Sequence, residues 1–187
     1  MSHFEKKLSG KRVFEGRIIS VDHDEVLLED GSLAMREVVT HPGGVAVLAA
    51  ENGYAYFVRQ FRYCFGKELL EIPAGKLEPG EDPEKAARRE LMEETGLSCK
   101  RLELLGCIFP SPGVYAEKLY LYFASGLEKG EAMPDEGEFL TAEKLGISAV
   151  EISKRLFKEG IMKSINDSID YDNAALLAAD MGIDLEY

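Results

Sequence analysis

Apolar and polar positions alternate along the start of the chain in the manner of β-strands. The stretches RVFEGRIISV and EVLLED alternate or cluster β-branched and apolar residues, as strands do. Asp30 and Gly31 form a turn pair before the next such stretch, SLAMREVV. The run 41–44, His-Pro-Gly-Gly, then interrupts the pattern. We therefore predict a small N-terminal antiparallel β module over residues 1–41.

Further strand-like segments follow, and they enclose one well-marked helix. The apolar stretches of GVAVLAAENGYAYFVRQFR flank an Asn-Gly pair at 52–53, which favours a two-residue hairpin. Residues 118–127, KLYLYFASGL, alternate as another strand. Between these segments, Asp82 can cap a helix, Pro83 suits its first position and Gly96 suits its left-handed end. The spacing predicts a helix between Asp82 and Gly96.

The last part of the chain is predicted to be helical beyond an acidic loop. Residues 128–139, EKGEAMPDEGEF, have the composition of an exposed loop. Ser148 and Glu151 form a capping box that opens a helix toward Lys158. The stretch DNAALLAADMG predicts another helix. The order of elements indicates an α/β fold, a mixed sheet with helices packed against it, over a second domain at residues 42–187.

Length and composition agree with a compact protein outside membranes. The chain has 187 residues, of which 45% are apolar and 30% charged, enough to bury a sizeable core. No apolar run approaches the roughly 20 residues that cross a bilayer. The polar start, MSHFEKKLSGKRVFEG, lacks the apolar centre of a secretory signal. We expect a cytoplasmic location and no membrane partner.

The net charge and the cysteines exclude two further classes. A net charge of −12 argues against a nucleic-acid partner, which needs a basic surface. An acidic protein can still act on a polyanion when a divalent cation bridges the two. The cysteines show no spacing typical of zinc sites, and we expect reduced thiols that fill space in or near the core. They are Cys64, Cys99 and Cys107.

The predicted helix carries a cluster of carboxylates. Glu90, Glu93 and Glu94 share one helical face within an arc of about 100°. Like charges at these spacings destabilise a helix, so the cluster is either a solvated acidic face or a ligand site. Glu81, just before the helix, adds a fourth carboxylate. Hard divalent cations such as magnesium take oxygen ligands of this kind.

The stretch GKLEPGEDPEKAARRELMEETGL resembles the Nudix signature at every defining position. The matching residues are Gly75, Glu81, Arg89, Glu90, Leu91, Glu93, Glu94, Gly96 and Leu97. The resemblance implies a Nudix hydrolase, built as an α/β/α sandwich with a mixed sheet. The solvated-face alternative becomes minor once this match is made.

The resemblance also implies a metal site with assigned ligands. Glu90 and Glu94 would be the principal ligands of Mg²⁺, with Mn²⁺ as a second possibility. Glu93 would be a further ligand, and the backbone carbonyl of Ala74 would complete the protein's share. Arg89 belongs to the same catalytic set, where its planar fork would hold a carboxylate rather than touch the substrate.

Nudix hydrolases cleave a nucleoside diphosphate linked to another moiety, and the base that activates water can lie outside the signature. In sequences resembling ADP-ribose pyrophosphatases, a glutamate on a late acidic loop takes this role. The matching segment here is PDEGEF, so Glu136 is the expected base and Glu138 the alternative. A loop that is merely solvated remains the competing interpretation.

Flanking segments resemble those of ADP-ribose pyrophosphatases, which implies hydrolysis of ADP-ribose to AMP and ribose 5-phosphate. The segments LLEIPAGKLEPGE, REVVTHPG and VRQFRY carry Glu71, Arg36 and Arg62, with Arg62 the natural phosphate partner. Pro112 is the sixteenth residue after the last glycine of the signature, a spacing typical of that subfamily. Glu117 follows where similar proteins place a contact to the terminal ribose.

The resemblance further implies a homodimer whose N-terminal sheets reach across the interface, with Arg36 serving the partner's site. Two other functions remain open. One is hydrolysis of a different nucleotide sugar, such as GDP-mannose, on the same helix. The other is a non-catalytic binding module of this fold, although such modules often lose the signature glutamates, and here all are present.

Overall fold

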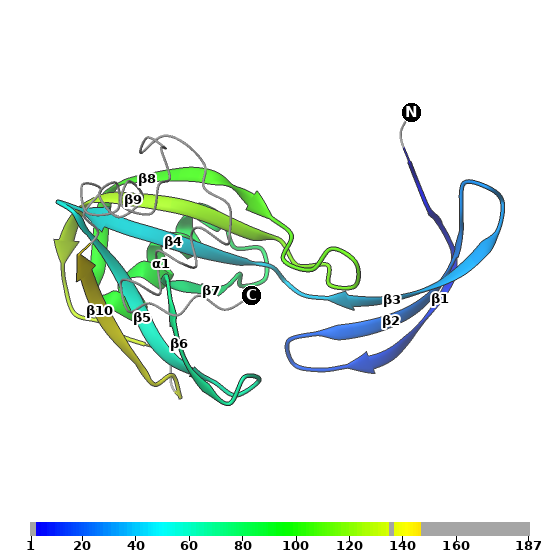
Figure 1. Ribbon diagram of the computed structural model, residues 1–187, viewed down its shortest axis with the longest axis horizontal. Coiled ribbons are helices and arrows are strands. Elements are labelled where there is room, and N and C mark those ends of the chain that lie inside the picture. The colour runs from blue at the N-terminus through cyan, green and yellow to red at the C-terminus, as the bar shows by residue number, and fades with distance from the viewer. Residues whose placement is uncertain (1–2, 135–136, 147–187) are drawn as a thin grey trace, which may run out of the picture. The chain divides into compact units, whose positions relative to one another are not determined.

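The computed structural model describes residues 3–134 and 137–146, shown as coloured ribbon in Figure 1. Within these residues the chain forms two β-sheets and the helix α1 (Pro83–Thr95). The predicted helices from Ser148 onward and near the C-terminus lie outside the described residues. No helix among the described residues is long and apolar enough to span a membrane.

The first sheet is the predicted N-terminal β module. Its strands, in the spatial order β1-β2-β3, run antiparallel. They are β1 (Lys6–Glu15), β2 (Ser20–Leu27) and β3 (Leu33–Thr40). Gly31, with φ of 84°, makes the predicted turn, and Asp30 accepts hydrogen bonds from the backbone and hydroxyl of Ser32. Every residue of β1 is exposed, so pairing with β2 rather than burial forms this strand, which starts earlier than its apolar pattern suggested.

The second sheet is mixed, as predicted. Its spatial order is β10-β5-β4-β9-β8, with β6 paired to β5 and β7 paired to β4. The strands β4 and β9 are parallel, whereas β8 and β9 are antiparallel. The bounds are β4 (Gly44–Glu51), β5 (Tyr54–Arg62), β6 (Lys67–Glu71), β7 (Ala74–Lys76), β8 (Leu97–Ile108), β9 (Leu119–Lys129) and β10 (Leu140–Gly146).

Local turn chemistry agrees with the prediction, but four strands escaped it. Asn52 and Gly53 adopt φ of 53° and 77°, which suits the tight hairpin between β4 and β5. The strands β6, β7, β8 and β10 show no clean alternation. The strand β8 is the clearest case, because it lies at the edge of the sheet, is largely exposed and has an irregular register between Leu104 and Gly106.

The core lies where α1 packs against the second sheet (Figure 1). The apolar face of the helix contributes Ala86, Ala87 and Leu91, each fully buried. The sheet contributes Val45 and Val47 from β4, which are also fully buried. Burial of these side chains is the main favourable term that fixes the helix on the sheet. The charged face of the helix is thereby fixed as well.

The cysteine prediction is wrong for two of the three residues. Cys64 and Cys107 are exposed, and Cys99 is half-buried; all are free thiols. Cys64 lies in the turn after β5, and Cys107 lies on the edge strand β8. Among the described residues, neither of these two side chains is covered.

The chain divides into two compact units, and the described part of the second is residues 51–55 and 144–146. Within that unit, Lys144 Nζ lies 4.1 Å from the centre of the Tyr54 ring. The helix α1 and the N-terminal sheet both belong to the first unit, residues 1–50 and 56–143. The division into domains 1–41 and 42–187 stays a prediction.

Candidate active site

Two caps fix the position of the carboxylate helix. Asp82 accepts hydrogen bonds from the backbone N–H of Glu84 and Lys85, at 3.1 and 3.2 Å. Gly96 ends the helix in the left-handed region at φ of 69°. With the apolar face on the sheet, Glu90 and Glu94 are turned inward and are only 8% and 3% exposed. These are charged side chains in a place where charge is costly.

The strand β7 passes directly over these two carboxylates. A side chain at Gly75 would place its Cβ 2.0 Å from Cδ of Glu90, so this position has room only for glycine. The backbone N–H of Ala74 donates to Oε2 of Glu94 at 2.9 Å. We call Ala74, Gly75, Glu90 and Glu94 the carboxylate cradle. Its walls are backbone and carboxylate oxygen, which are hard donors.

Arg89 gathers the surrounding carboxylates. Its Nη1 donates to Glu90 at 2.8 Å and to Glu93 at 2.9 Å. Its Nε and Nη2 donate to the two oxygens of Glu81, at 3.0 and 2.9 Å. The pKa of Arg89 is raised, chiefly by Glu81, and the pKa of Glu81 is lowered by Arg89. Glu81 also accepts from the backbone of Glu78, so it organises the loop before the helix.

The two buried carboxylates of the cradle are only partly balanced by positive charge. Burial, together with the charges of Glu90 and Glu138, raises the pKa of Glu94 to about 8. Burial also raises the pKa of Glu90, against the lowering effect of Arg89. Two carboxylates that are hard to ionise, on one face of one helix, form a site that a cation would complete.

Arg62 lies close enough to the cradle for its charge to act on Glu94. Its Nε and Nη2 donate to both oxygens of Glu71, at 2.7 and 2.8 Å, across the antiparallel strands β5 and β6. Glu71 is the main cause of the raised pKa of Arg62, and the charges of Glu94 and Glu138 contribute. Arg62 and Glu138 are therefore within electrostatic range of the metal-ligand candidates. The structure brings these predicted site residues together.

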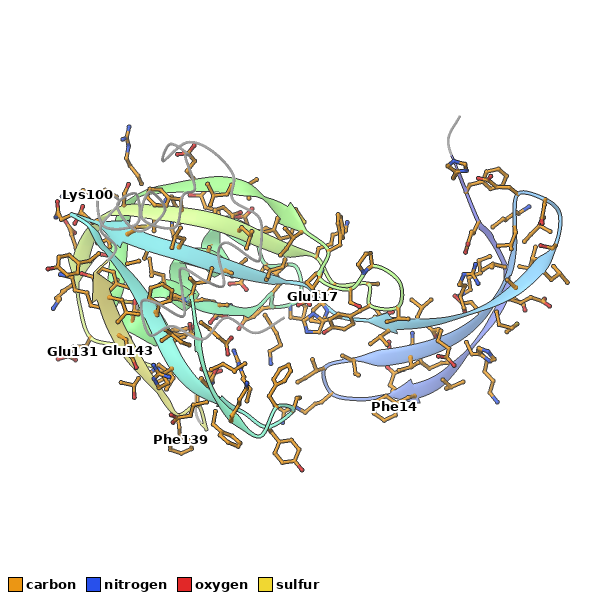
Figure 2. The ribbon with its side chains drawn as sticks, in the orientation of Figure 1. Phe14, Lys100, Glu117, Glu131, Phe139 and Glu143 are labelled. Atoms are coloured by element: carbon orange, nitrogen blue, oxygen red, sulfur yellow. The ribbon has the colours of Figure 1, made fainter. Side chains whose placement is uncertain are left out.

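The other predicted residues lie elsewhere or have other partners. Arg36, on β3, donates to both oxygens of Glu5, which directly precedes β1, at 2.9 and 2.6 Å. Pro112 lies in an exposed turn. Glu117 pairs with His41, at 3.3 Å from its Nδ1, near the junction of β3 and β4 (Figure 2). Glu136 lies outside the described residues.

The residues present fit a hard divalent cation only in part before one binds. Over residues 3–134 and 137–146, no group of three or more His, Cys, Asp or Glu side chains already converges as a metal site. The reason is visible, because Glu90 and Glu93 both accept from Arg89. The buried carboxylate of Glu94 and the close backbone at Gly75 nevertheless supply the oxygen-lined cradle that such an ion requires.

Sequence reasoning missed two pairs in this region. His41 looked like part of a chain-breaking run, yet its side chain is 7% exposed and contacts Glu117. Arg59 donates to Glu143 at 2.6 Å, which ties β5 to β10 just after the acidic loop. Both pairs join residues far apart in the sequence, so no local pattern could have revealed them.

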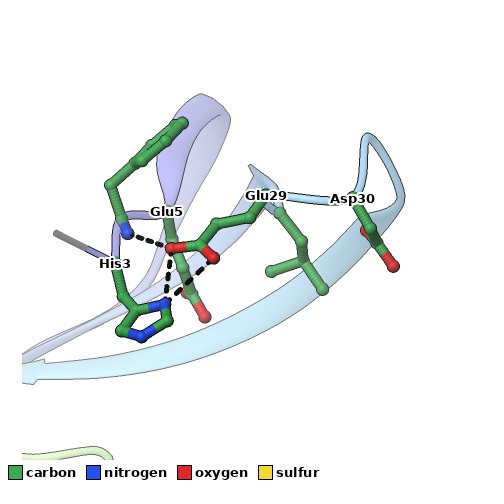
Figure 3. Close-up of a pocket in the computed structure, with 6 residues that line it drawn as sticks. His3, Glu5, Glu29 and Asp30 are labelled. Carbon is green, nitrogen blue, oxygen red and sulfur yellow. Dashed lines mark hydrogen bonds and ion pairs between the residues drawn. The ribbon is translucent and has the colours of Figure 1, made fainter. Parts of the chain in front are cut away.

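A separate hollow lies beside the start of β1 and the end of β2, lined by residues that include His3 and Glu29 (Figure 3). His3 Nδ1 lies 3.0 Å from Glu29, and the backbone N–H of Phe4 donates to the same carboxylate at 2.7 Å. Glu29 is thus already occupied by protein donors, and His3 is almost fully exposed. Nothing in this hollow resembles the buried charge of α1.

Comparison with known proteins agrees with the geometry. The NUDIX domain family matches residues 39–163. An ADP-ribose pyrophosphatase of Bacillus subtilis (strain 168) is 42% identical over 141 residues, covering 73% of this chain and 75% of the relative. A methanol dehydrogenase activator of Bacillus methanolicus is 45% identical over 139 residues, with the same shares. An ADP-ribose pyrophosphatase of Mycobacterium tuberculosis (strain ATCC 25618 / H37Rv) is 33% identical, covering 87% and 80%.

The fold has a counterpart among solved structures. A crystal structure of an ADP compounds hydrolase superposes with a TM-score of 0.69, over 95% of this chain and 92% of that one, at 19% identity. That likeness supports the fold. The match over residues 39–163 contains the complete glutamate helix and its glycines. The chain therefore belongs to the NUDIX family and is a NUDIX hydrolase.

Proposed function

We propose that this NUDIX hydrolase cleaves the pyrophosphate bond of ADP-ribose to give AMP and ribose 5-phosphate. The observation that carries the proposal is the buried pair Glu90 and Glu94, held against Gly75 and short of positive charge. The similarity to two proteins named ADP-ribose pyrophosphatase supports the choice of substrate.

The cofactor we propose is Mg²⁺, with Mn²⁺ as a substitute. Glu90, Glu94 and the Ala74 carbonyl would hold it, with Glu93 joining once it leaves Arg89. When bound, the ion neutralises phosphate charge and lowers the pKa of the attacking water. Arg89 would hold Glu81 beside the helix. Its hydrogen bonds to Glu90 and Glu93 would compete with the ion for these two carboxylates.

Arg62 would bind the pyrophosphate. It now holds Glu71 through two parallel hydrogen bonds, and the guanidinium fork suits phosphate oxygens equally well. Bound substrate would therefore take the place of Glu71 as the anion that Arg62 holds. In the free protein, Arg62 remains paired with Glu71. Glu71 keeps the arginine side chain in place until then.

The acidic loop would supply the general base. Glu136 is our first candidate. Glu138 is the second, and its support is electrostatic, because its charge raises the pKa of both Glu90 and Glu94. A carboxylate whose charge acts on both cradle residues is a candidate to accept a proton from the attacking water.

We also propose a homodimer. The N-terminal sheet carries apolar side chains that are about half exposed, and a sheet of this size cannot bury both faces alone. These side chains are Leu8, Val13, Phe14, Leu33 and Met35. Arg36, on the same sheet, would then reach the partner's site. A monomer with full activity in sedimentation and kinetic measurements would contradict this arrangement.

The decisive experiment is a hydrolysis panel with the full chain. ADP-ribose, GDP-mannose, NADH and dinucleoside polyphosphates are each incubated with and without Mg²⁺, and products are separated. We expect Mg²⁺-dependent AMP from ADP-ribose at the highest kcat/KM. A preference for GDP-mannose would reassign the substrate, whereas absence of hydrolysis across the panel would favour a binding module.

A second function has one specific observation in its favour, the 45% identity to a protein named methanol dehydrogenase activator. We propose to add the full chain to a methanol dehydrogenase and measure the turnover of that enzyme, using wild type and Glu94→Gln. Activation by wild type alone would make hydrolysis part of the effect. Equal activation by both proteins would indicate binding, and no activation would remove this function.

A further inference from the structure

The segment that leads from β9 into the acidic loop crosses the C-terminal end of α1. This segment is residues 130–133, and we call it the loop root. The backbone N–H of Gly130 donates to the carbonyl of Gly96 at 2.6 Å. The backbone N–H of Met133 donates to the carbonyl of Glu93 at 2.9 Å. The loop root is therefore bound to the helix that carries the cradle carboxylates.

Backbone hydrogen bonds, rather than burial, hold the loop root in place. Residues 130–134 are all exposed, and Met133 is 66% exposed. The carbonyl groups in the last turn of a helix have no partner within the helix. Met133 supplies such a partner to Glu93, so one hydrogen bond both satisfies the end of α1 and fixes where the acidic loop begins.

Gly96 has two separable properties at this crossing. Its φ of 69° is left-handed, a conformation in which asparagine is the usual substitute for glycine at a helix end. Its missing side chain is a second property. A Cβ on Gly96 would lie 2.8 Å from the backbone nitrogen of Ala132 and 3.0 Å from the carbonyl oxygen of Gly130. These are backbone atoms of the loop root, which cannot rotate away as the end of a side chain could.

The loop root leads to a carboxylate whose charge reaches the cradle. Glu138, on the same acidic loop, raises the pKa of Glu90 and of Glu94. Glu93, which accepts the hydrogen bond from the loop root, stands between these two residues in the sequence of α1. The metal-ligand candidates and the start of the acidic loop are thus joined through one turn of helix.

The far end of the acidic loop has a weaker attachment. Glu143 of β10 accepts from Arg59 of β5 at 2.6 Å, and these two side chains are 27% and 40% exposed. Water screens an ion pair of this kind. The position of the loop beside α1 therefore depends more on the loop root than on this pair.

We infer that Gly96 and the hydrogen bond from Met133 to Glu93 position the acidic loop, so that the metal-ligand helix itself sets where the general base stands. This inference rests on the proposed function, in which the acidic loop supplies that base. Gly96 and Met133 are positioning residues, because they act through the loop. A catalytic group displaced by about 1 Å can lose about 10²-fold in rate. Loss of the loop root therefore lowers kcat and leaves KM and Mg²⁺ affinity unchanged.

The first test separates the two properties of Gly96. Gly96→Asn keeps the left-handed helix end and adds a side chain against the loop root. We expect kcat to fall about 10- to 100-fold, with KM and Mg²⁺ affinity within about twofold of wild type. Gly31→Asn is the matched control, since Gly31 has φ of 84° and a Cβ there meets nothing within 4 Å. Wild-type kcat in Gly96→Asn, or an equal loss in the control, would overturn the inference.

The second test leaves α1 unchanged and removes the donor. Met133→Pro lacks the backbone N–H, and Met133→Ala keeps it while deleting the exposed side chain. Met133 precedes Pro134, which already favours an extended backbone at this position. We expect Met133→Pro to lower kcat about as much as Gly96→Asn, and Met133→Ala to stay within about twofold of wild type. Equal losses in the two Met133 variants would assign the effect to the side chain and overturn the inference.

A double-variant cycle tests whether the loss passes through the base. Gly96→Asn is combined with Glu136→Gln and, separately, with Glu138→Gln. In the variant that lacks the base, a displaced loop has no base left to misplace, so we expect Gly96→Asn to add less than about a threefold loss. The full loss of Gly96→Asn in both combinations would contradict positioning of either glutamate.

Amide hydrogen exchange provides a readout that needs no activity. The amides of Gly130 and Met133 should exchange slowly in wild type although their segment is exposed, because both are hydrogen-bonded. Gly96→Asn should accelerate both at least about tenfold while the amide of Leu91 in α1 stays slow. Fast exchange of both amides in wild type would overturn the inference. Slow exchange in wild type and fast exchange in Gly96→Asn, without hydrolysis of any substrate in the panel, would support the attachment and locate the failure in the proposed function.

Discussion

The buried carboxylates of α1 and the Arg36–Glu5 pair beside the N-terminal sheet carry their charges in opposite environments. On the sheet, Arg36 pairs with Glu5 and both side chains remain more than a third exposed. On the helix, Glu90 and Glu94 are buried. Glu90 accepts one hydrogen bond from Arg89, which also serves two other carboxylates, and Glu94 accepts from the backbone N–H of Ala74. Water screens the first arrangement, whereas the second keeps its imbalance. The difference indicates which acidic residues are positioned for function.

Removing one buried carboxylate should have the largest effect. Glu94→Gln takes away a proposed principal ligand and should lower kcat/KM for ADP-ribose about 10³-fold, the scale of a lost electrostatic stabiliser. Glu84→Gln is the matched control. Glu84 lies on the same helix but is exposed, and its carboxylate forms an ion pair with Arg88. We expect the control to keep nearly full activity. Equal losses in both variants would mean that burial does not mark the site.

The two candidate bases test the acidic loop. Glu136→Gln or Glu138→Gln should lower kcat about 10²-fold at unchanged Mg²⁺ affinity, the range of general base catalysis. A loss confined to Glu138→Gln would assign the base to the residue whose charge acts on the cradle. If both variants turn over normally, the base lies elsewhere and the loop is only a solvated surface.

Adding a side chain on β7, which faces the carboxylates of α1, tests the geometry of the cradle. Gly75→Ala puts a methyl group where the Glu90 carboxyl now lies, so the carboxylate or β7 must move. We expect a loss of about 1–3 kcal/mol in unfolding free energy together with a large loss of activity. Gly106→Ala is the control, since a Cβ there meets nothing within 4 Å. Denaturant titration and kinetics measure both.

The buried carboxylate should also leave a signature in stability against pH. Burial raises the pKa of Glu94 to about 8 in the folded, metal-free protein, above its ordinary 4.5. Below pH 4.5 the residue is protonated in both folded and unfolded states. Between these values the unfolded chain ionises first, so unfolding free energy falls as pH rises and the loss is complete above the folded pKa.

We therefore expect Glu94→Gln to stabilise the protein at pH 8 in the presence of a chelator, relative to its effect at pH 5, by a few kcal/mol. Added Mg²⁺ should reduce that difference in wild type, because the ion stabilises the ionised carboxylate. Parallel stability curves for wild type and Glu94→Gln would show that Glu94 titrates normally.

The same contrast explains what could be predicted from the sequence. The helix was predictable because Asp82 and Gly96 carry their signals locally. The mixed sheet followed from the order of elements, with the apolar run of β4 before that helix and the alternating strand β9 after it. The strand β8 was not, since its exposed edge relaxes the pattern. Cys64 and Cys107 were misplaced because an apolar residue type does not reveal whether a second layer covers it. The pairs His41–Glu117 and Arg62–Glu71 depend on tertiary contact.

The exposed pairs of the N-terminal sheet provide the smallest and most selective test. Arg36→Ala and Arg12→Ala each remove an arginine that pairs with acidic neighbours on that sheet, Glu5 for Arg36 and Asp22 with Glu15 for Arg12. Because water screens both sets, neither change should shift the melting temperature measurably. If the sheet exchanges between subunits, Arg36→Ala should still raise KM for ADP-ribose several-fold while Arg12→Ala does not. Identical kinetics for the two variants would confine Arg36 to its own sheet, as an exposed charge that neither stabilises the fold nor serves a site.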